Sequence, residues 1–453
     1  MIKRIVTAVL VLSVLLSFSG CTASQQTAKP LRICLDMAFT GNAKYSGEML
    51  CEELKVFLED DARAFSGVGR VEIELIPKKG EERTAVIDRI RTEIENGGGP
   101  DLFLISNATQ DTIGENALFP FPEQAMAKGT FLSLDEYIKN AEFTDWNKLY
   151  SVILNAGKTE QGQMIVPLSY TLPVTCFKQS EVQHTPSATL TWADMVDDET
   201  WIMQASALWL RSRSRFYPQW EDTYLEYILG ESVDFEKGEL LFEEEELTGV
   251  LRDLVKLCNA ETRGKFDALP AHYQVSMNVR YRMRSVGIDV LYDGIDFDTP
   301  LTMVPLYSTD GGVTATVVSF AAVNANTKHA QAAFQVLDLL LCRPMQMHSE
   351  LYQSFLGDLG MPMHTNLVLD GEAIRTYKGE RSMPEASSDA YRSVLNEITH
   401  VRFRNALEAH FDALYKAFYA QGMRSGLDDA DRLKELVAEG YEEMQEAVKA
   451  AAE

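Results

Sequence analysis

Residues 31–106 alternate between segments with a strand period and segments with a helix period. Apolar and polar residues alternate in residues 31–39 and 71–77, and residues 101–106 are nearly all apolar. Between these segments, residues 47–64 and 81–96 place apolar side chains three and four positions apart. Strands that alternate with helices predict an α/β fold, with a parallel sheet covered by helices on both faces.

The remainder of the chain is richer in helical pattern. Residues 191–271 are mostly helical in spacing, strand-like stretches return at 301–306 and 313–323, and a helix is predicted over 329–341. A helical block is predicted from residue 387 to the end, with apolar side chains on one face: Leu407, Phe411, Leu414 and Phe418. The pattern in the second half of the chain therefore predicts a helix-rich α/β lobe.

The N-terminus has the layout of an export signal. Lys3 and Arg4 precede an apolar run over residues 5–16, which is too short to span a bilayer comfortably. Residues 18–21, Phe-Ser-Gly-Cys, resemble the lipobox of bacterial lipoproteins, in which the cysteine is lipidated. This resemblance implies a signal peptide over 1–20, a lipid on Cys21 and a tether over 21–30. The alternative is an ordinary secretory signal with an incidental cysteine.

Charge and length narrow the classes of function. The chain has 453 residues, with 42 Lys and Arg against 67 Asp and Glu, which gives a net charge of −25. Such an excess repels a polyanion, so we expect no nucleic-acid partner. The length suggests two or three compact lobes, and a chain of this size buries a core without metal ions or disulfides.

Several short motifs follow one another in a characteristic order. They are Pro100-Asp101-Leu102-Phe103, Leu132-Ser133-Leu134-Asp135, Ile165-Val166-Pro167-Leu168, Thr191-Trp192-Ala193-Asp194, Ala321-Ala322-Val323-Asn324 and Gly360-Met361-Pro362-Met363. In this order and spacing the chain resembles the extracellular solute-binding proteins, family 1, over nearly its whole mature length. We therefore expect an α/β, two-lobed, periplasmic-binding-protein-like fold with hinge-connected lobes and a ligand cleft.

The resemblance implies a division of the chain and a set of partners. Lobe one would comprise residues 31–172 and 305–360, and lobe two residues 173–304 and 361–453, with crossings near 169–174, 305–312 and 360. A small solute, most often a saccharide in this family, would bind between the lobes and pass to the transmembrane subunits of an ABC permease. The protein would be a monomer without a cofactor, lipid-anchored at the extracytoplasmic face of the cell membrane.

Candidate ligand-binding residues lie at strand ends and at the crossings. Phe39 and Asn107 follow the first and third predicted strands, Tyr170 lies at the first crossing, and Tyr307 and Gly311 lie at the second. Trp209 and Tyr292 are further candidates, because aromatic faces stack on the apolar faces of sugars. For each aromatic residue, ordinary packing in the core remains the rival explanation.

Two arginine series allow a different solute. Arg211, Arg213 and Arg215, like Arg280, Arg282 and Arg284, recur at every second position, which in a strand would align three guanidinium groups for an anionic ligand. The alternative is that these arginines pair with surface acids.

Catalytic and metal-binding patterns are missing from the sequence. It contains no HExxH, GxSxG or phosphate-binding loop, and its histidines lack metal-ligand spacing. We therefore expect no enzyme, no cofactor and no metal. Two alternatives stay open: a surface lipoprotein that senses a solute and signals to a membrane partner, and a lipid-anchored glycan hydrolase with paired carboxylates.

Overall fold

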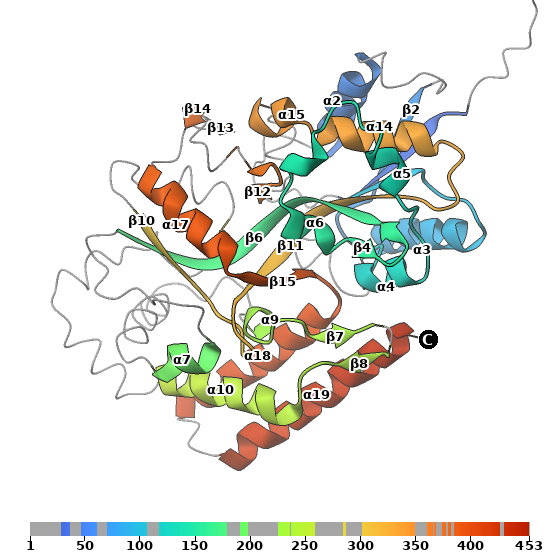
Figure 1. Cartoon of the computed structure of the whole chain (residues 1–453). Helices are drawn as coiled ribbons and strands as arrows, with labels where there is room; N and C mark the ends of the chain where they lie inside the picture. Colours follow the sequence, from blue (N-terminus) through green and yellow to red (C-terminus); the bar gives the residue numbers. More distant parts are fainter. Residues whose placement is uncertain are drawn as a thin grey trace, which may run out of the picture.

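A mixed nine-stranded sheet organises the described part of the chain. The computed structural model, drawn in Figure 1, describes residues 29–36, 47–60, 70–106, 117–178, 191–197, 225–235, 237–258, 284–286, 301–348, 360–365, 367, 374–376, 379–381, 385–425 and 430–452. The strands of the main path follow the order β10-β6-β11-β3-β1-β2, while β12 and β9 pair with β6, and β15 pairs with β11.

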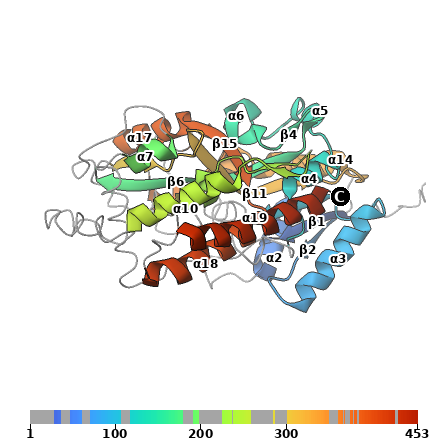
Figure 2. The same cartoon turned by 90° about the horizontal axis from the view of Figure 1, so that it is seen from below.

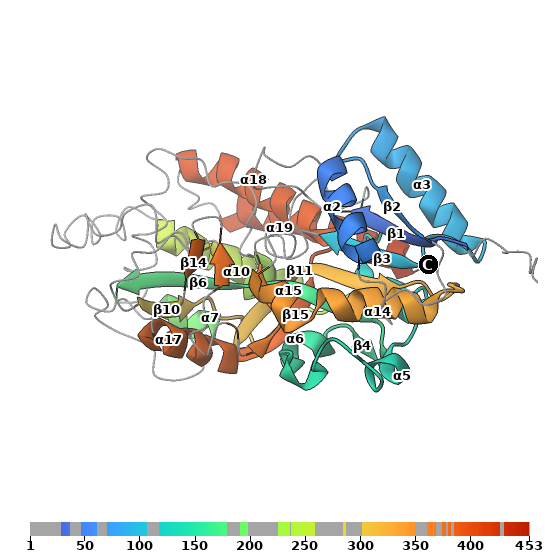
Figure 3. The ribbon, with the colours of Figure 1, turned by 90° about the horizontal axis from the view of Figure 1, so that it is seen from above.

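The first three strands form the parallel part of the sheet. They are β1 (Leu31–Asp36), β2 (Val71–Leu75) and β3 (Leu102–Ser106), and β1 lies parallel to both of the others. Helices α2 (Gly47–Asp60) and α14 (Ala330–Leu340) lie on one side of these strands, and α3 (Glu81–Glu95) lies on the other, as Figures 1, 2 and 3 together show. Every residue of β3 is buried, which explains its unbroken apolar run.

Two long strands continue the sheet with the opposite direction. β11 (Val313–Val323) is antiparallel to β3 and to β6 (Ile165–Lys178), which runs through the middle of the molecule in Figure 1. Shorter strands pair with these two: β9 (Arg284–Val286), β10 (Leu301–Pro305), β12 (Met361–Pro362) and β15 (Ile398–Phe403).

A second group of elements, mostly helical, packs beside the far half of β6 and β11. In Figures 1 and 2 the long helices α10 (Glu244–Cys258), α18 (Leu407–Ser425) and α19 (Ala430–Ala452) lie side by side. With them lie α7 (Trp192–Asp197), α9 (Leu225–Ile228) and the hairpin of β7 (Val233–Asp234) with β8 (Glu239–Leu240), while α17 (Glu385–Asn396) packs against β10 on the other side of β6 (Figure 1).

Short elements complete the described chain. They are α4 (Pro122–Ala127), α5 (Asp135–Ile138), the 3-10 helix η2 (Trp146–Lys148), α6 (Ser151–Asn155), α15 (Arg343–His348), and the hairpins β4–β5 (Lys158–Thr159, Gly162–Gln163) and β13–β14 (Ile374–Thr376, Gly379–Arg381).

Most of the predicted elements are confirmed, and three expectations need correction. The sheet is mixed rather than parallel, because β11 and β6 enter it in antiparallel order. The predicted C-terminal helical block contains the strand β15, whose backbone pairs in parallel with β11. The predicted helical region over 191–271 includes the β7–β8 hairpin. In each case a hydrogen-bonded partner strand determines the conformation, and in the first two that strand is remote in sequence.

Candidate functional site

The two halves of the sheet are joined where β6 and β11 change partners. The first residues of β6, Ile165–Ser169, pair with β11, while Leu172–Lys178 pair with β9 and β10. Likewise β11 pairs with β15 over Val313–Val317 and with β6 and β3 from Ser319 onward. At this change of partners the hydroxyls of Ser169 and Ser319 lie 2.8 Å apart, and both are buried.

A third strand passes the same point. Met361 of β12 pairs with Tyr170, and Pro362 pairs with Ser169. Three segments that are far apart in sequence therefore cross side by side between the two groups of elements. Such a crossing is a place where two lobes can rotate about a few backbone torsions.

Tyr170, a predicted ligand residue, is completely buried at this crossing. Its hydroxyl forms a 2.6 Å hydrogen bond with the hydroxyl of Tyr391 on α17, and its ring meets the edge of Tyr150 at 5.7 Å. Burial is the main influence that raises the pKa of Tyr170, so the phenol stays neutral. In this structure Tyr170 ties β6 to α17, and its contact with a solute stays a prediction.

Tyr307 and Gly311 lie together in the turn that precedes β11. Tyr307 is buried, and its hydroxyl donates to Glu397 Oε2 at 2.5 Å; burial, followed by this carboxylate, raises the pKa of the phenol. Gly311 has φ 94° and Gly312 φ 84°, and a Cβ on Gly312 would lie 2.3 Å from the Thr399 side chain. The turn needs glycine for its backbone, and a ligand role for Gly311 stays a prediction.

The other predicted site residues lie outside the described residues. They are Phe39, Asn107, Trp209, Tyr292 and the lipidation residue Cys21. The strands before two of them are described: β1 ends at Asp36 and β3 at Ser106. Because β1 and β3 are parallel neighbours, the chain leaves the same edge of the sheet at both points.

At this edge the structure reveals a buried ion pair that we did not predict. Arg83 Nη1 and Nη2 donate to Asp36 Oδ1 and Oδ2, both at 2.8 Å, and both side chains are 2% exposed. The signal in the sequence was Asp36, an acidic residue at the end of the mostly apolar strand β1. The pair holds α3 against the carboxyl end of β1, next to the segment that carries Phe39.

A second buried charge cluster lies where β15 meets α18. Arg402 pairs with Glu408, lies 3.9 Å from Glu226 and sits 5.8 Å above the ring of Tyr227. Arg404 Nε donates to the second oxygen of Glu408 at 2.7 Å. The charges of this cluster are paired with one another, and the ion pairs hold α9, β15 and α18 together.

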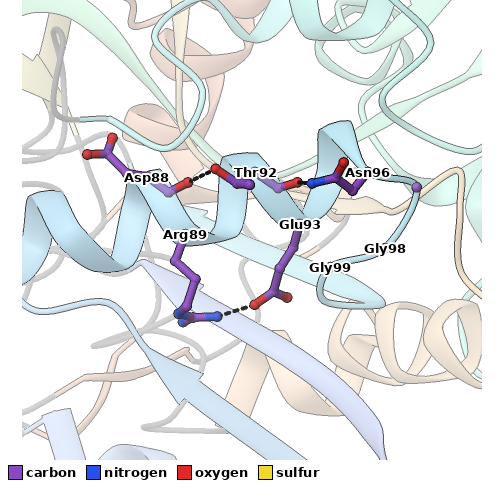
Figure 4. Close-up of a pocket in the computed structure, with 8 residues that line it drawn as sticks. Asp88, Arg89, Thr92, Glu93, Asn96, Gly98 and Gly99 are labelled. Atoms are coloured by element: carbon purple, nitrogen blue, oxygen red, sulfur yellow. Dashed lines mark hydrogen bonds and ion pairs between the residues drawn. The ribbon is translucent and has the colours of Figure 1, made fainter.

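A depression of about 510 Å³ lies along α3, as Figure 4 shows. Its polar groups already pair with one another: Thr92 Oγ1 donates to the Asp88 carbonyl and Asn96 Nδ2 to the Thr92 carbonyl, each at 2.8 Å, and Arg89 pairs with Glu93. It lies at the turn that leads into β3, at the opposite end of that strand from the predicted cleft.

Two kinds of feature are absent from the described residues. These residues hold no cluster of three or more His, Cys, Asp or Glu side chains placed to bind a metal ion. In the ranges that the structure describes, we also find no helix with the length and apolar character needed to cross a membrane.

Comparisons with known proteins identify the fold. No family model matches the chain, and no curated protein matches it. Three similar solved structures are an extracellular solute-binding protein family 1 from Alicyclobacillus acidocaldarius, a periplasmic solute binding protein from Pectobacterium atrosepticum and a periplasmic oligogalacturonide binding protein from Yersinia enterocolitica.

Each of the three matches nearly end to end. The TM-score is 0.52 in all cases, with 13%, 14% and 14% identity in the order given. The matches cover 93%, 94% and 94% of this chain and 99%, 100% and 100% of the others. The chain therefore has the two-lobed α/β fold of these proteins, which confirms at the level of the fold the resemblance seen in the sequence.

Proposed function

We propose that the chain is the solute-binding receptor of an ABC importer, and that its solute is a saccharide. The observation that carries this proposal is the fold, which matches solute-binding proteins over 93–94% of the chain. One of the similar proteins is named for oligogalacturonide binding, which supports a saccharide among the candidate solutes. The lipobox-like sequence at Cys21 supports a lipid anchor at the outer face of the cell membrane.

The proposed lobes follow the crossing strands. Residues 31–172 and 305–360 form lobe one, and residues 173–304 and 361–453 form lobe two. We place the solute between them, in contact with Phe39, Asn107, Trp209 and Tyr292. Tyr170, Tyr307 and Gly311 remain proposed neighbours of the cleft.

Binding in this proposal acts through closure of the lobes. A solute that touches both lobes binds the closed form more tightly, and it shifts the population toward that form by the difference in affinity. The permease then distinguishes closed from open receptors. No bond of the solute is broken, so the protein needs no catalytic group.

A thermal-shift screen of residues 22–453 tests the proposal. The panel contains neutral mono- and oligosaccharides, uronic acids, phosphorylated sugars, amino acids and polyamines. A ligand at a hundred times its dissociation constant adds about 2.7 kcal/mol to the free energy of unfolding, which raises the melting temperature measurably. A hit among anions alone would favour the arginine series as the binding groups.

A pair of matched variants locates the site. Asn107→Ala should weaken binding of the hit about five- to thirtyfold, because it removes a hydrogen-bonding side chain that contributes on the order of one to two kcal/mol. Asn140→Ala, at an exposed position in the turn after α5, should leave the affinity unchanged. The proposal fails if nothing in the panel shifts the melting temperature, or if a compound that binds is converted to product, as a glycan hydrolase would do.

A further inference from the structure

The helix α4 joins the two proposed lobes. Its own segment is anchored in lobe one, because the ring of Phe119 lies 5.1 Å from that of Phe103 on β3. Toward lobe two, the Ala406 N–H donates to the Pro120 carbonyl at 2.9 Å, and the Phe121 and Phe235 rings lie 5.6 Å apart. These contacts must break or slide when the lobes separate.

Glu123 lies inside this contact with half of its carboxylate unpaired. Its Oε1 accepts the N–H of Phe403 on β15 at 3.3 Å. Its Oε2 is shielded from solvent and has no hydrogen-bond partner, although the residue as a whole is only half-buried. A carboxylate in this position loses hydration without full replacement by protein donors, whereas a neutral carboxyl loses much less.

The charges around Glu123 do not compensate for this loss. Burial is the largest influence and raises the pKa of Glu123 to about 7; its own backbone N–H, the Phe403 N–H and Arg402 act to lower the pKa, and Glu231 acts to raise it. Arg402 is already paired with Glu408, and Glu226 and Arg404 complete that cluster. Arg402 therefore compensates only part of the negative charge of the Glu123 carboxylate.

We propose that Glu123 is a protonation-sensitive latch between the lobes. With a neutral carboxyl, the contact of α4 with the β15–α18 junction is favoured; with a carboxylate, separation of the lobes is favoured because it returns the charge to water. The proposal rests on the proposed function, since it assumes that the two groups of elements move apart. It makes acidity a regulator of closure, and therefore of affinity for the solute.

The sign and size follow from linkage. A hydrated glutamate has its usual pKa of 4.5, and in the contact the pKa of Glu123 is about 7. Between these two values the contact state holds a proton that the separated state has lost, so rising pH favours separation about tenfold per unit. The limiting shift is about 300-fold; most of it falls between pH 4.5 and pH 7, and it levels off about one pH unit beyond each of these values.

Hydrogen exchange resolved to single amides tests the latch on the full chain, without any solute. The reporters are the amides of Phe403, which bonds to Glu123, and Ala406, which bonds to Pro120. After correction for the intrinsic rate, we expect protection of both to fall at least tenfold from pH 5 to pH 8 in the wild type. Glu123→Gln, which keeps the acceptor but cannot ionise, should hold the protection constant.

Two further variants keep the test sharp. Glu231→Gln changes an exposed side chain that raises the pKa of Glu123, so it should move the transition to lower pH. Glu136→Gln, an exposed acid on α5 away from the contact, should leave the wild-type profile unchanged. The Glu231 variant reports on the latch even if Glu123→Gln does not fold.

Three results would overturn the proposal: a flat profile in the wild type, the same profile in Glu123→Gln, or a change at Phe403 with none at Ala406. The last would show a local effect without movement of the lobes. Because the measurement uses no solute, it can succeed while the thermal-shift screen fails, so the failures of the latch and of the receptor function are distinguishable.

Discussion

The buried pair of Arg83 and Asp36 gives a prediction whose size can be worked from the structure. Replacing Arg83 with Met removes both 2.8 Å hydrogen bonds to the carboxylate, which is 2% exposed. It also removes the 3.1 Å bond to the Pro77 carbonyl. The Asp36 carboxylate then stays buried without its cation. Binding a proton costs less free energy than keeping this charge buried.

The free energy of protonating Asp36 at pH 7 determines the expected destabilisation. Burial is the larger influence and raises the pKa of Asp36, whereas Arg83 lowers it; without Arg83 the carboxyl should be neutral in the folded state. Neutralising a carboxyl with the usual pKa of 3.8 at pH 7 costs about 4 kcal/mol, at about 1.4 kcal/mol per pH unit. Direct measurements on broken buried pairs span a similar range, about 3–5 kcal/mol.

This reasoning fixes a dependence on pH with a definite sign. In Arg83→Met the folded carboxyl binds a proton that the unfolded chain loses above its usual pKa, so the variant gains stability relative to the wild type as pH falls. From pH 7 to pH 5 the deficit should shrink by about 3 kcal/mol. The double variant Arg83→Met with Asp36→Leu should recover most of the loss, since apolar replacement of a buried pair is often neutral.

Urea unfolding at pH 7 and pH 5, followed by circular dichroism, measures these values. Arg70→Met is the matched control, because Arg70 is 68% exposed in its pair with Glu72, and surface pairs contribute about 0–1 kcal/mol. The reasoning is refuted if Arg83→Met costs no more than Arg70→Met at pH 7, or if its deficit is the same at pH 5.

Three other variants have definite expectations in thermal or urea unfolding. Asp338→Asn should cost about 3–5 kcal/mol, because the buried carboxylate accepts three backbone N–H groups and the Trp146 indole N–H; a loss under about 1 kcal/mol would contradict this. Gly312→Ala should cost about 2–3 kcal/mol through its positive φ and its clash with Thr399, and Thr399→Ala should relieve part of that cost. Tyr391→Phe should cost about 1–3 kcal/mol by leaving the buried Tyr170 hydroxyl without this partner, and adding Tyr170→Phe should not double the loss.

The local helices and strands were predictable because their buried positions recur in the sequence with the period of a helix or a strand. The run Leu102–Ser106 is apolar throughout, as expected of a strand covered on both faces, and all of its residues are buried. The helix Glu81–Glu95 buries Ile87 and Ile90 from its apolar face. In these segments the pattern of buried residues can be seen within the segment itself, so it can be recognised without knowledge of the rest of the chain.

Strand β15 could not be predicted, because the residues that stabilise its conformation lie elsewhere in the chain. His400 and Arg402 look like exposed residues of a helix, yet His400 bonds to Asp310 at 3.0 Å and Arg402 approaches Glu226. The backbone of the strand pairs with β11, more than eighty residues earlier. A single sequence carries no sign of such pairing.

The place where β6 changes partners could be predicted from the sequence, but the direction of its side chains could not, and the binding of a solute there stays a prediction. The resemblance placed Tyr170 at a crossing between lobes, and the chain does change partners there. Which way the ring points depends on the register, because neighbouring residues of a strand face opposite sides. Ser169 meets Ser319, whereas Tyr170 meets Tyr391, and a shift of one residue would have exchanged these contacts.

The crossing also determines where the balance between open and closed forms is set. A rotation about the middle of β6 and β11 leaves the pairing of Ile165–Ser169 with β11 and of Leu172–Lys178 with β9 and β10 intact. The free energy of that rotation therefore depends on contacts that reach across from one group to the other. Among the described residues, the segment around α4 supplies such contacts through Pro120, Phe121 and Glu123. In this proposal, protonation of Glu123 acts on the whole motion because its carboxyl lies in a contact that both groups share.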